Sequence, residues 1–425
     1  RRLRDFFVAA PTMMGANSKL LYPTTTLSND TLDNRLIKRV ANGDATYFDA
    51  ELFKFISDDL LNAIHKVFKR PIKNAAYTYD NFDPAFVTAM EQNLFHFSAA
   101  KTLAEVQKLN QLYRKAKTFE EFSREAAKVC TKFNKVWQRT EYETANLTAE
   151  SAANYQRLIK KANRFPYWQY VTAGDEKVRE EHRKLNGVIL EVKDPRWDKI
   201  YPPNGWKCRC RVKPLLKNEV NESIVKASQQ TVDNFFGSVE WSNSVASHFD
   251  HNPGKRQHVF NANQMYVKKF PNKATKLMDK VTPDDWGLKH SYKQLVRDTT
   301  KKASLYEGNA ADWWDLHKKV VEKEEALPME DFAKRIWHMD KKSFDEHTTD
   351  TKKKRAFRTK YLDTISEVMK DPDEVWLSKD PDMDQTQDNY LNQWLYIKYY
   401  EGVAIVCVCK LQNQQMNFKT WYELH

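Results

Sequence analysis

Apolar residues return at helical spacing along the first third of the chain. From Asp49 to Pro71 they recur at three- and four-residue steps, which places them on one face of a helix: Phe53, Ile56, Leu60, Ile64, Val67 and Phe68. The same spacing predicts helices over residues 84–115 and 119–145. Residues 1–40 show no sustained period and are expected to form an extended arm. We therefore predict a helical bundle that follows an N-terminal arm.

The pattern changes to short strands and turns between Arg164 and Pro214, a stretch that contains Trp168, Trp197 and Trp206. Its Pro-Pro-Asn-Gly run, residues 202–205, joins two prolines of fixed φ to two residues that adopt positive φ. This run is predicted to be a rigid turn that orients the segment with Cys208 and Cys210.

Roughly the last hundred residues predict an α+β domain. A stripe of apolar residues at helical spacing indicates a helix: Tyr361, Leu362, Ile365, Val368 and Met369. The helix is expected to end at residues 371–373. Strands are expected over residues 374–377, 394–400, 403–409 and 416–422, with a polar loop over residues 380–389. The order is one or two helices followed by an antiparallel sheet.

Composition narrows the function classes. The 425 residues leave room for two or three domains, and no apolar run reaches the roughly 20 residues that span a bilayer, so we expect a soluble protein without a membrane partner. The net charge of +12 favours a polyanionic partner, either nucleic acid or an acidic protein surface. Two Cys-x-Cys pairs and a lone Cys130 indicate a reducing compartment, because cysteines two positions apart do not readily close a relaxed disulfide. A start at Arg1 rather than Met fits a processed or trimmed product.

An ordered set of residues in the central stretch carries a resemblance to a known family. The set comprises Asp175, Val178, Arg179, His182, Leu185, Gly187, residues 202–206, Cys208, Arg209, Cys210 and Val212, with flanking pieces at residues 139–141 and 249–254. It resembles the signature of the phage Mu F-like head morphogenesis (minor capsid) family, over about residues 130–265. The resemblance implies a structural role in the phage head near the portal, with portal and capsid proteins as partners.

The same stretch raises the question of a metal. Nitrogen and sulfur ligands are available from His182, Cys208, Cys210 and Cys130. Structural zinc sites, however, usually have two to four residues between paired cysteines and use four ligands. We therefore predict a packed histidine and buried thiols, with no metal and no cofactor. Arg179 has two interpretations, a contact to DNA or an ion pair with Asp175 or Glu181.

Four short motifs near the C-terminus carry a second resemblance, over roughly ninety residues. They are His347 to Arg358, residues 371–376, residues 396–398 and residues 420–422. Their order resembles the phage-associated nucleases of the barnase–EndoU–colicin–RelE fold, which implies metal-independent cleavage of RNA.

The residue types fit that chemistry. His347 is predicted to act as general acid or base, because imidazole titrates near neutrality. Arg358 and Lys398 are predicted to hold the phosphate, and Thr420 and Tyr422 share one strand face and present hydroxyls. Each has a structural alternative: His347 as an exposed helix-cap residue, Lys398 as a charge guarding an edge strand, and Tyr422 as a packing anchor. A basic tract is predicted to attract phosphate without reading sequence: Lys352, Lys353, Lys354 and Arg355.

The expected fold class is an α+β multidomain protein. Its predicted parts are residues 1–130 (arm and helical region), 131–300 (Trp-rich Mu F-like module), 301–326 (linker) and 327–425 (nuclease-like helix and antiparallel sheet).

We predict a phage minor head protein that associates with portal and capsid and carries a ribonuclease-like effector domain. Two alternatives stay open: a polymorphic-toxin ribonuclease whose Mu F-like part serves only for delivery, and a purely structural capsid protein with an inactive C-terminal domain. RNA is the expected ligand of the C-terminal domain, and an immunity protein is a further candidate partner. The expected locations are the virion and the host bacterial cytoplasm.

Overall fold

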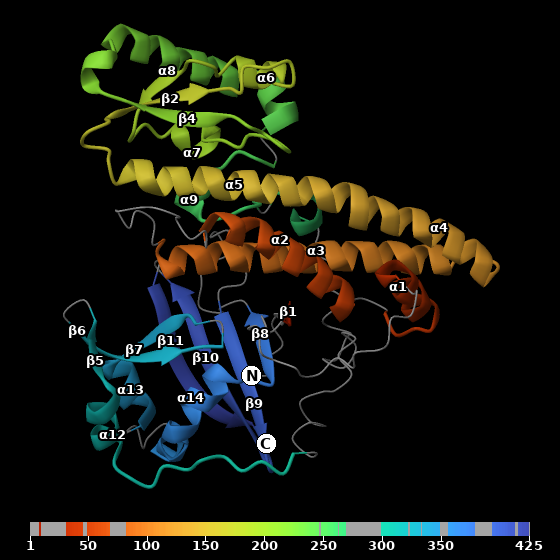
Figure 1. The fold of residues 1–425 in the computed structure, drawn as a ribbon, viewed down its shortest axis with the longest axis vertical. Helices are drawn as coiled ribbons and strands as arrows, with labels where there is room; N and C mark the ends of the chain where they lie inside the picture. The colour runs from red at the N-terminus through yellow and green to blue at the C-terminus, as the bar shows by residue number, and fades with distance from the viewer. Residues whose placement is uncertain are drawn as a thin grey trace. The chain divides into compact units, whose positions relative to one another are not determined.

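A computed structural model describes residues 8–9, 31–45, 49–68, 82–245, 248–261, 263–268, 299–321, 324–332, 334–348, 356–378, 393–412 and 415–424. The chain forms two compact units. The central unit is residues 51–271, and the sheet unit combines residues 1–50 with residues 272–425. The predicted class, α+β with a helical N-terminal region and a C-terminal sheet domain, is confirmed (Figure 1). Within the described residues, no helix is both long and apolar enough to cross a membrane.

Long helices build the first part of the central unit. They are α2 (Ala50–Phe68), α3 (Pro84–Tyr113), α4 (Phe119–Thr131), the π-helical segment η1 (Lys132–Trp137) and α5 (Gln138–Ile159). Local sequence sets where they start: Asp83 caps α3 by accepting from the backbone N–H of Ala85, and Thr118 caps α4 by accepting from that of Glu121. In Figure 1, α4 and α5 run on as one long rod, and α4 packs against α3.

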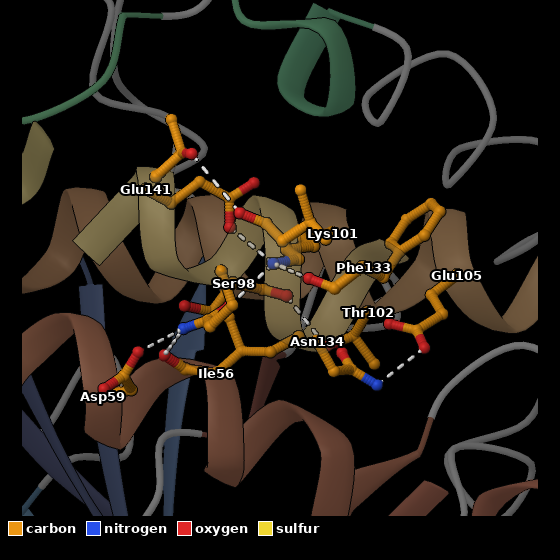
Figure 2. A network of polar contacts seen from close by, with 12 residues as sticks. Ile56, Asp59, Ser98, Lys101, Thr102, Glu105, Phe133, Asn134 and Glu141 are labelled. Atoms are coloured by element: carbon orange, nitrogen blue, oxygen red, sulfur yellow. Dashed lines mark hydrogen bonds and ion pairs between the residues drawn. The ribbon is translucent and has the colours of Figure 1, made fainter. Parts of the chain in front are cut away.

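A buried polar network joins these helices (Figure 2). Lys101 of α3 is fully buried, and its Nζ atom donates to Glu141 Oε2 at 2.5 Å, Gln138 Oε1 at 2.7 Å and the Phe133 carbonyl at 3.0 Å. Three acceptors therefore satisfy the three donors of the ammonium group. Burial raises the pKa of Glu141, and the Lys101 charge opposes that rise.

A small antiparallel sheet forms the second part of the central unit. Its strands are β2 (Tyr167–Val171), β3 (Ile189–Glu191) and β4 (Arg211–Leu215), in the order β3-β2-β4. Short helical segments lie between and after them: α6 (Glu180–Arg183), α7 (Trp197–Ile200), η2 (Lys217–Glu219), α8 (Glu222–Phe236), η3 (Trp241–Val245) and α9 (Pro253–Arg256). Trp168 of β2 is fully buried, with its ring centroid 5.9 Å from those of Trp197 and Tyr201. The Trp-rich stretch is thus a packed aromatic core.

The predicted turn at residues 202–205 reverses in a different way from the one expected. The Pro202–Pro203 bond is cis, and the positive φ falls at Lys207, at 57°, rather than at Gly205. A Cβ atom on Gly205 would lie 3.2 Å from Arg179 Nη1 and 3.6 Å from His182 Cε1. A side chain at this position would therefore crowd the end of the Arg179 side chain, whereas its contact with His182 would be an ordinary van der Waals one.

An eight-stranded sheet organises the sheet unit, in the order β1-β8-β9-β10-β11-β7-β6-β5. Its strands are β1 (Val8–Ala9), β5 (Lys319–Val321), β6 (Glu324–Glu330), β7 (Ile336–Asp340), β8 (Glu374–Ser378), β9 (Gln393–Tyr400), β10 (Val403–Gln412) and β11 (Gln415–Leu424). Neighbouring strands are antiparallel except β7 and β11, which run parallel and pair at His338 and Asn417. The helical segments are α1 (Leu32–Ala41), α12 (Ala310–His317), α13 (Lys341–Thr348), η5 (Ala356–Tyr361) and α14 (Leu362–Lys370).

Two expectations for this unit were wrong. Residues 32–41 are helical rather than part of an extended arm, because Thr31 caps α1 and Leu36, Ile37 and Val40 are buried on one face. Residues 301–326 hold α12, β5 and the first part of β6 and are not a linker, since β6 pairs with both β5 and β7. The predicted loop at residues 380–389 lies outside the described residues.

Candidate functional site

Three of the five predicted catalytic residues meet in the sheet unit. His347 lies in the last turn of α13, Arg358 in η5 and Thr420 on β11. The Arg358 Nη1 atom donates to His347 Nδ1 at 3.1 Å and to Thr420 Oγ1 at 2.6 Å. Residues far apart in the sequence are thereby joined through one guanidinium nitrogen.

Hydrogen bonds from side chains to backbone carbonyls fix the position of η5. The indole N–H of Trp421 donates to the Arg358 carbonyl at 2.9 Å, and the Thr359 hydroxyl donates to the Thr348 carbonyl at 3.3 Å. The Trp421 ring also lies 6.0 Å, between centroids, from the partly buried His347 ring. The helix-cap interpretation of an exposed His347 is therefore wrong, because the ring packs against the sheet.

The contact with Arg358 defines the tautomer of His347. A guanidinium group only donates hydrogen bonds, so Nδ1 is the acceptor and Nε2 carries the proton of the neutral ring. Nη1 has two hydrogens, and the contacts to His347 and Thr420 use both of them.

Lys398 lies apart from these residues. It is buried, and its Nζ atom donates to Asp371 Oδ2 at 2.8 Å and to the Asp371 carbonyl at 2.5 Å. Lys398 pairs with Ile405, whereas Tyr422 pairs with the next residue, Val406, so the two side chains point to opposite faces of the sheet. The edge-strand interpretation of Lys398 is also wrong, because β9 lies between β8 and β10.

Tyr422 and Thr420 share a face of β11, as strand alternation predicts. Tyr422 packs against a buried apolar cluster: Leu395, Ile397, Tyr399, Ala404, Val406 and Val408. Burial raises the pKa of the Tyr422 phenol, and the Arg358 charge opposes that rise. These contacts match the packing-anchor interpretation.

The predicted basic tract at residues 352–355 lies outside the described residues. The sequence analysis missed a second polar group beside η5, formed by Glu423, Tyr361 and Lys360. The Tyr361 hydroxyl donates to Glu423, and Lys360 Nζ lies 3.2 Å from Glu423 Oε2. The alternation of side chains along a strand could have revealed this group, because it puts Glu423 on the same face of β11 as Trp421.

The central unit brings together three residues that the sequence analysis considered as metal ligands. The ligand atoms of His182, Cys208 and Cys210 all lie within 4.8 Å of one another, and Cys130 of α4 is not part of this group. A hydrogen bond from Cys210, followed by His182, lowers the pKa of Cys208 well below its usual value.

Arg179 does not form the predicted ion pair with Asp175 or Glu181 in the described contacts, and its contact to DNA stays a prediction. Its Nη2 atom donates to the Trp206 carbonyl at 2.7 Å, and Asp175 pairs with Arg209 at 2.7 Å instead. Arg179 therefore braces the turn that precedes Cys208.

Comparisons with known proteins match two separate regions of the chain. Residues 100–213 match the family described as Phage Mu protein F like protein, and residues 316–424 match the family described as phage-Barnase-EndoU-ColicinE5/D-RelE like nuclease2. Both resemblances seen in the sequence are confirmed, so the chain joins a Mu F-like region to a phage nuclease-like region.

Two curated relatives share part of the chain. The Mu-like prophage FluMu F protein of Haemophilus influenzae is 40% identical over 90 residues, which are 21% of this chain and 22% of that protein. The putative capsid assembly protein F of Escherichia phage Mu is 38% identical over 89 residues, 21% of this chain and 20% of that protein. The chain therefore spans about a fifth of the length of each of these relatives. No solved structure matches the chain significantly.

Proposed function

We propose that the chain is a minor component of a phage head that contacts portal and capsid proteins, and that its sheet unit is a metal-independent endoribonuclease. The head role is supported by the Mu F-like match and by the name of the phage Mu relative, a putative capsid assembly protein. The nuclease role is supported by the match over residues 316–424. The observation that carries it is the single Arg358 nitrogen that bonds both His347 and Thr420.

The proposed reaction is a transesterification within RNA. A phosphodiester anion draws the Arg358 guanidinium away from the neutral His347 nitrogen, because a hydrogen bond between opposite charges is stronger than one from a cation to a neutral acceptor. The lone pair of His347 Nδ1 is then available to take the proton of the ribose 2′-hydroxyl.

The bond changes balance as follows. The 2′-oxygen forms a bond to phosphorus as the bond from phosphorus to the 5′-oxygen breaks, which yields a cyclic phosphate and a free 5′-hydroxyl. The leaving 5′-oxygen takes a proton from solvent, and the imidazolium of His347 returns its proton to solvent. Arg358 stabilises the charge that develops on the phosphate oxygens, and Thr420 holds its guanidinium in place.

The test is RNA cleavage by the full chain in excess chelator, with the His347→Ala variant beside it. Removal of a general base is expected to lower the rate by about 100-fold or more. The matched control is His317→Ala, because His317 belongs to the same unit, is exposed and stacks on Trp313. The control is expected to cleave at the unmodified rate.

Two outcomes would refute the proposal. Intact RNA with the unmodified chain at low salt excludes the nuclease role, and equal cleavage by the His347→Ala and His317→Ala variants removes His347 from the reaction. The head role is tested separately, by mass spectrometry of purified virions and by cross-linking to the portal. Absence of the chain from the particles contradicts it.

A further inference from the structure

Three side chains with metal-ligating atoms meet beside β4 in the central unit. His182 comes from α6, and Cys208 and Cys210 come from the segment that leads into β4. His182 Nδ1 lies 3.6 Å from Cys208 Sγ and 3.7 Å from Cys210 Sγ. Among the described residues, this is the one group of three or more His, Cys, Asp or Glu side chains whose ligand atoms are so close.

The His182 ring is oriented by a contact on its far side. Its Nε2 atom lies 3.1 Å from the Asn204 carbonyl, which only accepts, so Nε2 carries the proton and the Nδ1 lone pair faces the two sulfurs. Asn204 is itself held, because its Oδ1 atom accepts from the Tyr170 hydroxyl at 3.0 Å. Outer hydrogen bonds of this kind fix the tautomer of a metal-binding histidine.

The distances fit a common metal ion. Zinc bonds of about 2.3 Å to sulfur and about 2.0–2.1 Å to nitrogen, at tetrahedral angles, put sulfur about 3.6 Å from nitrogen. Both observed separations lie within 0.1 Å of that value. A thiol hydrogen bond explains only one of them, because the single lone pair of Nδ1 accepts one S–H group.

We propose that His182 Nδ1, Cys208 Sγ and Cys210 Sγ bind one zinc ion. Two thiolates and an imidazole form a soft donor set that suits zinc and not magnesium or calcium. Three protein ligands leave a fourth position for water, and the adjoining pocket is lined by four cations: Lys177, Arg179, Lys207 and Arg209. Asp175 pairs with Arg209 and Glu143 pairs with Lys207, so the rim carries charges of both signs and does not by itself select the charge of the fourth ligand.

This proposal reverses the expectation of no metal drawn from spacing. That expectation applied the rule for four-ligand sites, in which two to four residues lie between the paired cysteines. One residue lies between Cys208 and Cys210. The structure supplies the third ligand from α6, which is 26 residues before Cys208. Gly205 lies beside the same ring, since a Cβ atom there would be 3.6 Å from His182 Cε1, an ordinary van der Waals contact.

The test uses the reduced full chain. Expression with zinc in the medium followed by elemental analysis is expected to give about one zinc ion per chain. Replacement by cobalt(II) is expected to give the visible colour of a tetrahedral site and a thiolate charge-transfer absorption. Cys208→Ser, Cys210→Ser and His182→Gln are each expected to lower metal content and abolish that absorption, whereas Cys130→Ala retains both.

Two results would overturn the site: a reduced chain that takes up neither zinc nor cobalt, or Cys208→Ser and Cys210→Ser variants that bind cobalt as the unmodified chain does. If a variant fails to fold by circular dichroism, alkylation of the unmodified chain decides. Zinc is expected to protect Cys208 and Cys210 from alkylation, and a chelator is expected to expose them. Equal labelling of the two cysteines with and without chelator also refutes the proposal.

Discussion

The two candidate sites each contain a histidine in the same tautomer with a different neighbour. In the central unit, the Nδ1 atom of His182 faces two sulfurs while its Nε2–H group donates to a carbonyl. In the sheet unit, the Nδ1 atom of His347 faces the Arg358 guanidinium. A lone pair aimed at thiols suits a metal ion, whereas a lone pair covered by a guanidinium group suits phosphate chemistry. The neighbour of Nδ1, and not the histidine itself, decides the chemistry.

The largest expected effect concerns stability in the central unit alone. Lys101→Met leaves the Glu141 carboxylate buried without its ammonium partner, which is expected to cost about 3–5 kcal/mol. The double variant Lys101→Met, Glu141→Leu is expected to recover most of that loss. Hydrogen exchange read by peptide should show faster exchange in residues 51–271 and unchanged exchange in the sheet unit. Equal losses in both units would break the comparison.

Acid is expected to weaken the central unit through two buried histidines. Burial first, and then the His258 charge, lowers the pKa of His96 to about 4 and that of His251 to about 3. Below the ordinary histidine pKa of about 6.5, the unfolded chain binds protons that the folded chain does not, so stability falls with pH. For His96 the loss is about 3 kcal/mol between pH 6.5 and pH 4.

Denaturant midpoints for the central unit across that pH window check this expectation. The His96→Gln variant is expected to show a shallower slope over the same window. A slope identical to that of the unmodified chain means that His96 is not the group responsible.

Arg358→Lys tests the phosphate side of the comparison. Lysine keeps the charge but loses the planar group that bonds His347 and Thr420 together, so cleavage is expected to fall about 100-fold. Zinc content is expected to stay the same. Cleavage at the unmodified rate would show that charge alone suffices and that the shared nitrogen has no role.

The smallest expected effect comes from Thr420→Val, which removes one hydrogen bond to a charged group and keeps the side-chain shape. Such bonds contribute roughly 1.5–3 kcal/mol when both partners are buried, and partial exposure here reduces this to about a tenfold loss of cleavage. Single-turnover rates at saturating RNA measure it. A loss as large as that of His347→Ala would assign Thr420 a direct chemical role.

Helix positions were predictable because local signals agree with the tertiary structure. Asp83 and Pro84 start α3 where the apolar pattern begins, and the predicted end at residue 115 differs by two residues from the observed Tyr113. The burial of Lys101 on that helix was not predictable, since its partners come from η1 and α5. Strand β6 was missed because Pro328 and the neighbouring charges obscure its alternation.

The site residues likewise fall into those that local sequence indicated and those whose positions depend on the tertiary structure. His347, Arg358 and Thr420 were recognised from motif order, whereas the separation of Lys398 depends on strand register, which no single strand reveals. The convergence of His182 with Cys208 and Cys210 depends on the turn at residues 202–207. The contacts of this turn come from residues distant in sequence: the Lys207 N–H group donates to Thr144 Oγ1, and Gly205 lies close to Arg179 and His182.

Strand β1 has a consequence for assembly. Val8 and Ala9 pair with Leu377 and Trp376 and form the outermost strand of the sheet next to β8. During synthesis these residues leave the ribosome long before their partners exist, so the β1–β8 pair cannot form until residue 377 has been made. Without β1, β8 presents unpaired amide and carbonyl groups at this border, to which an extended segment of another polypeptide can attach.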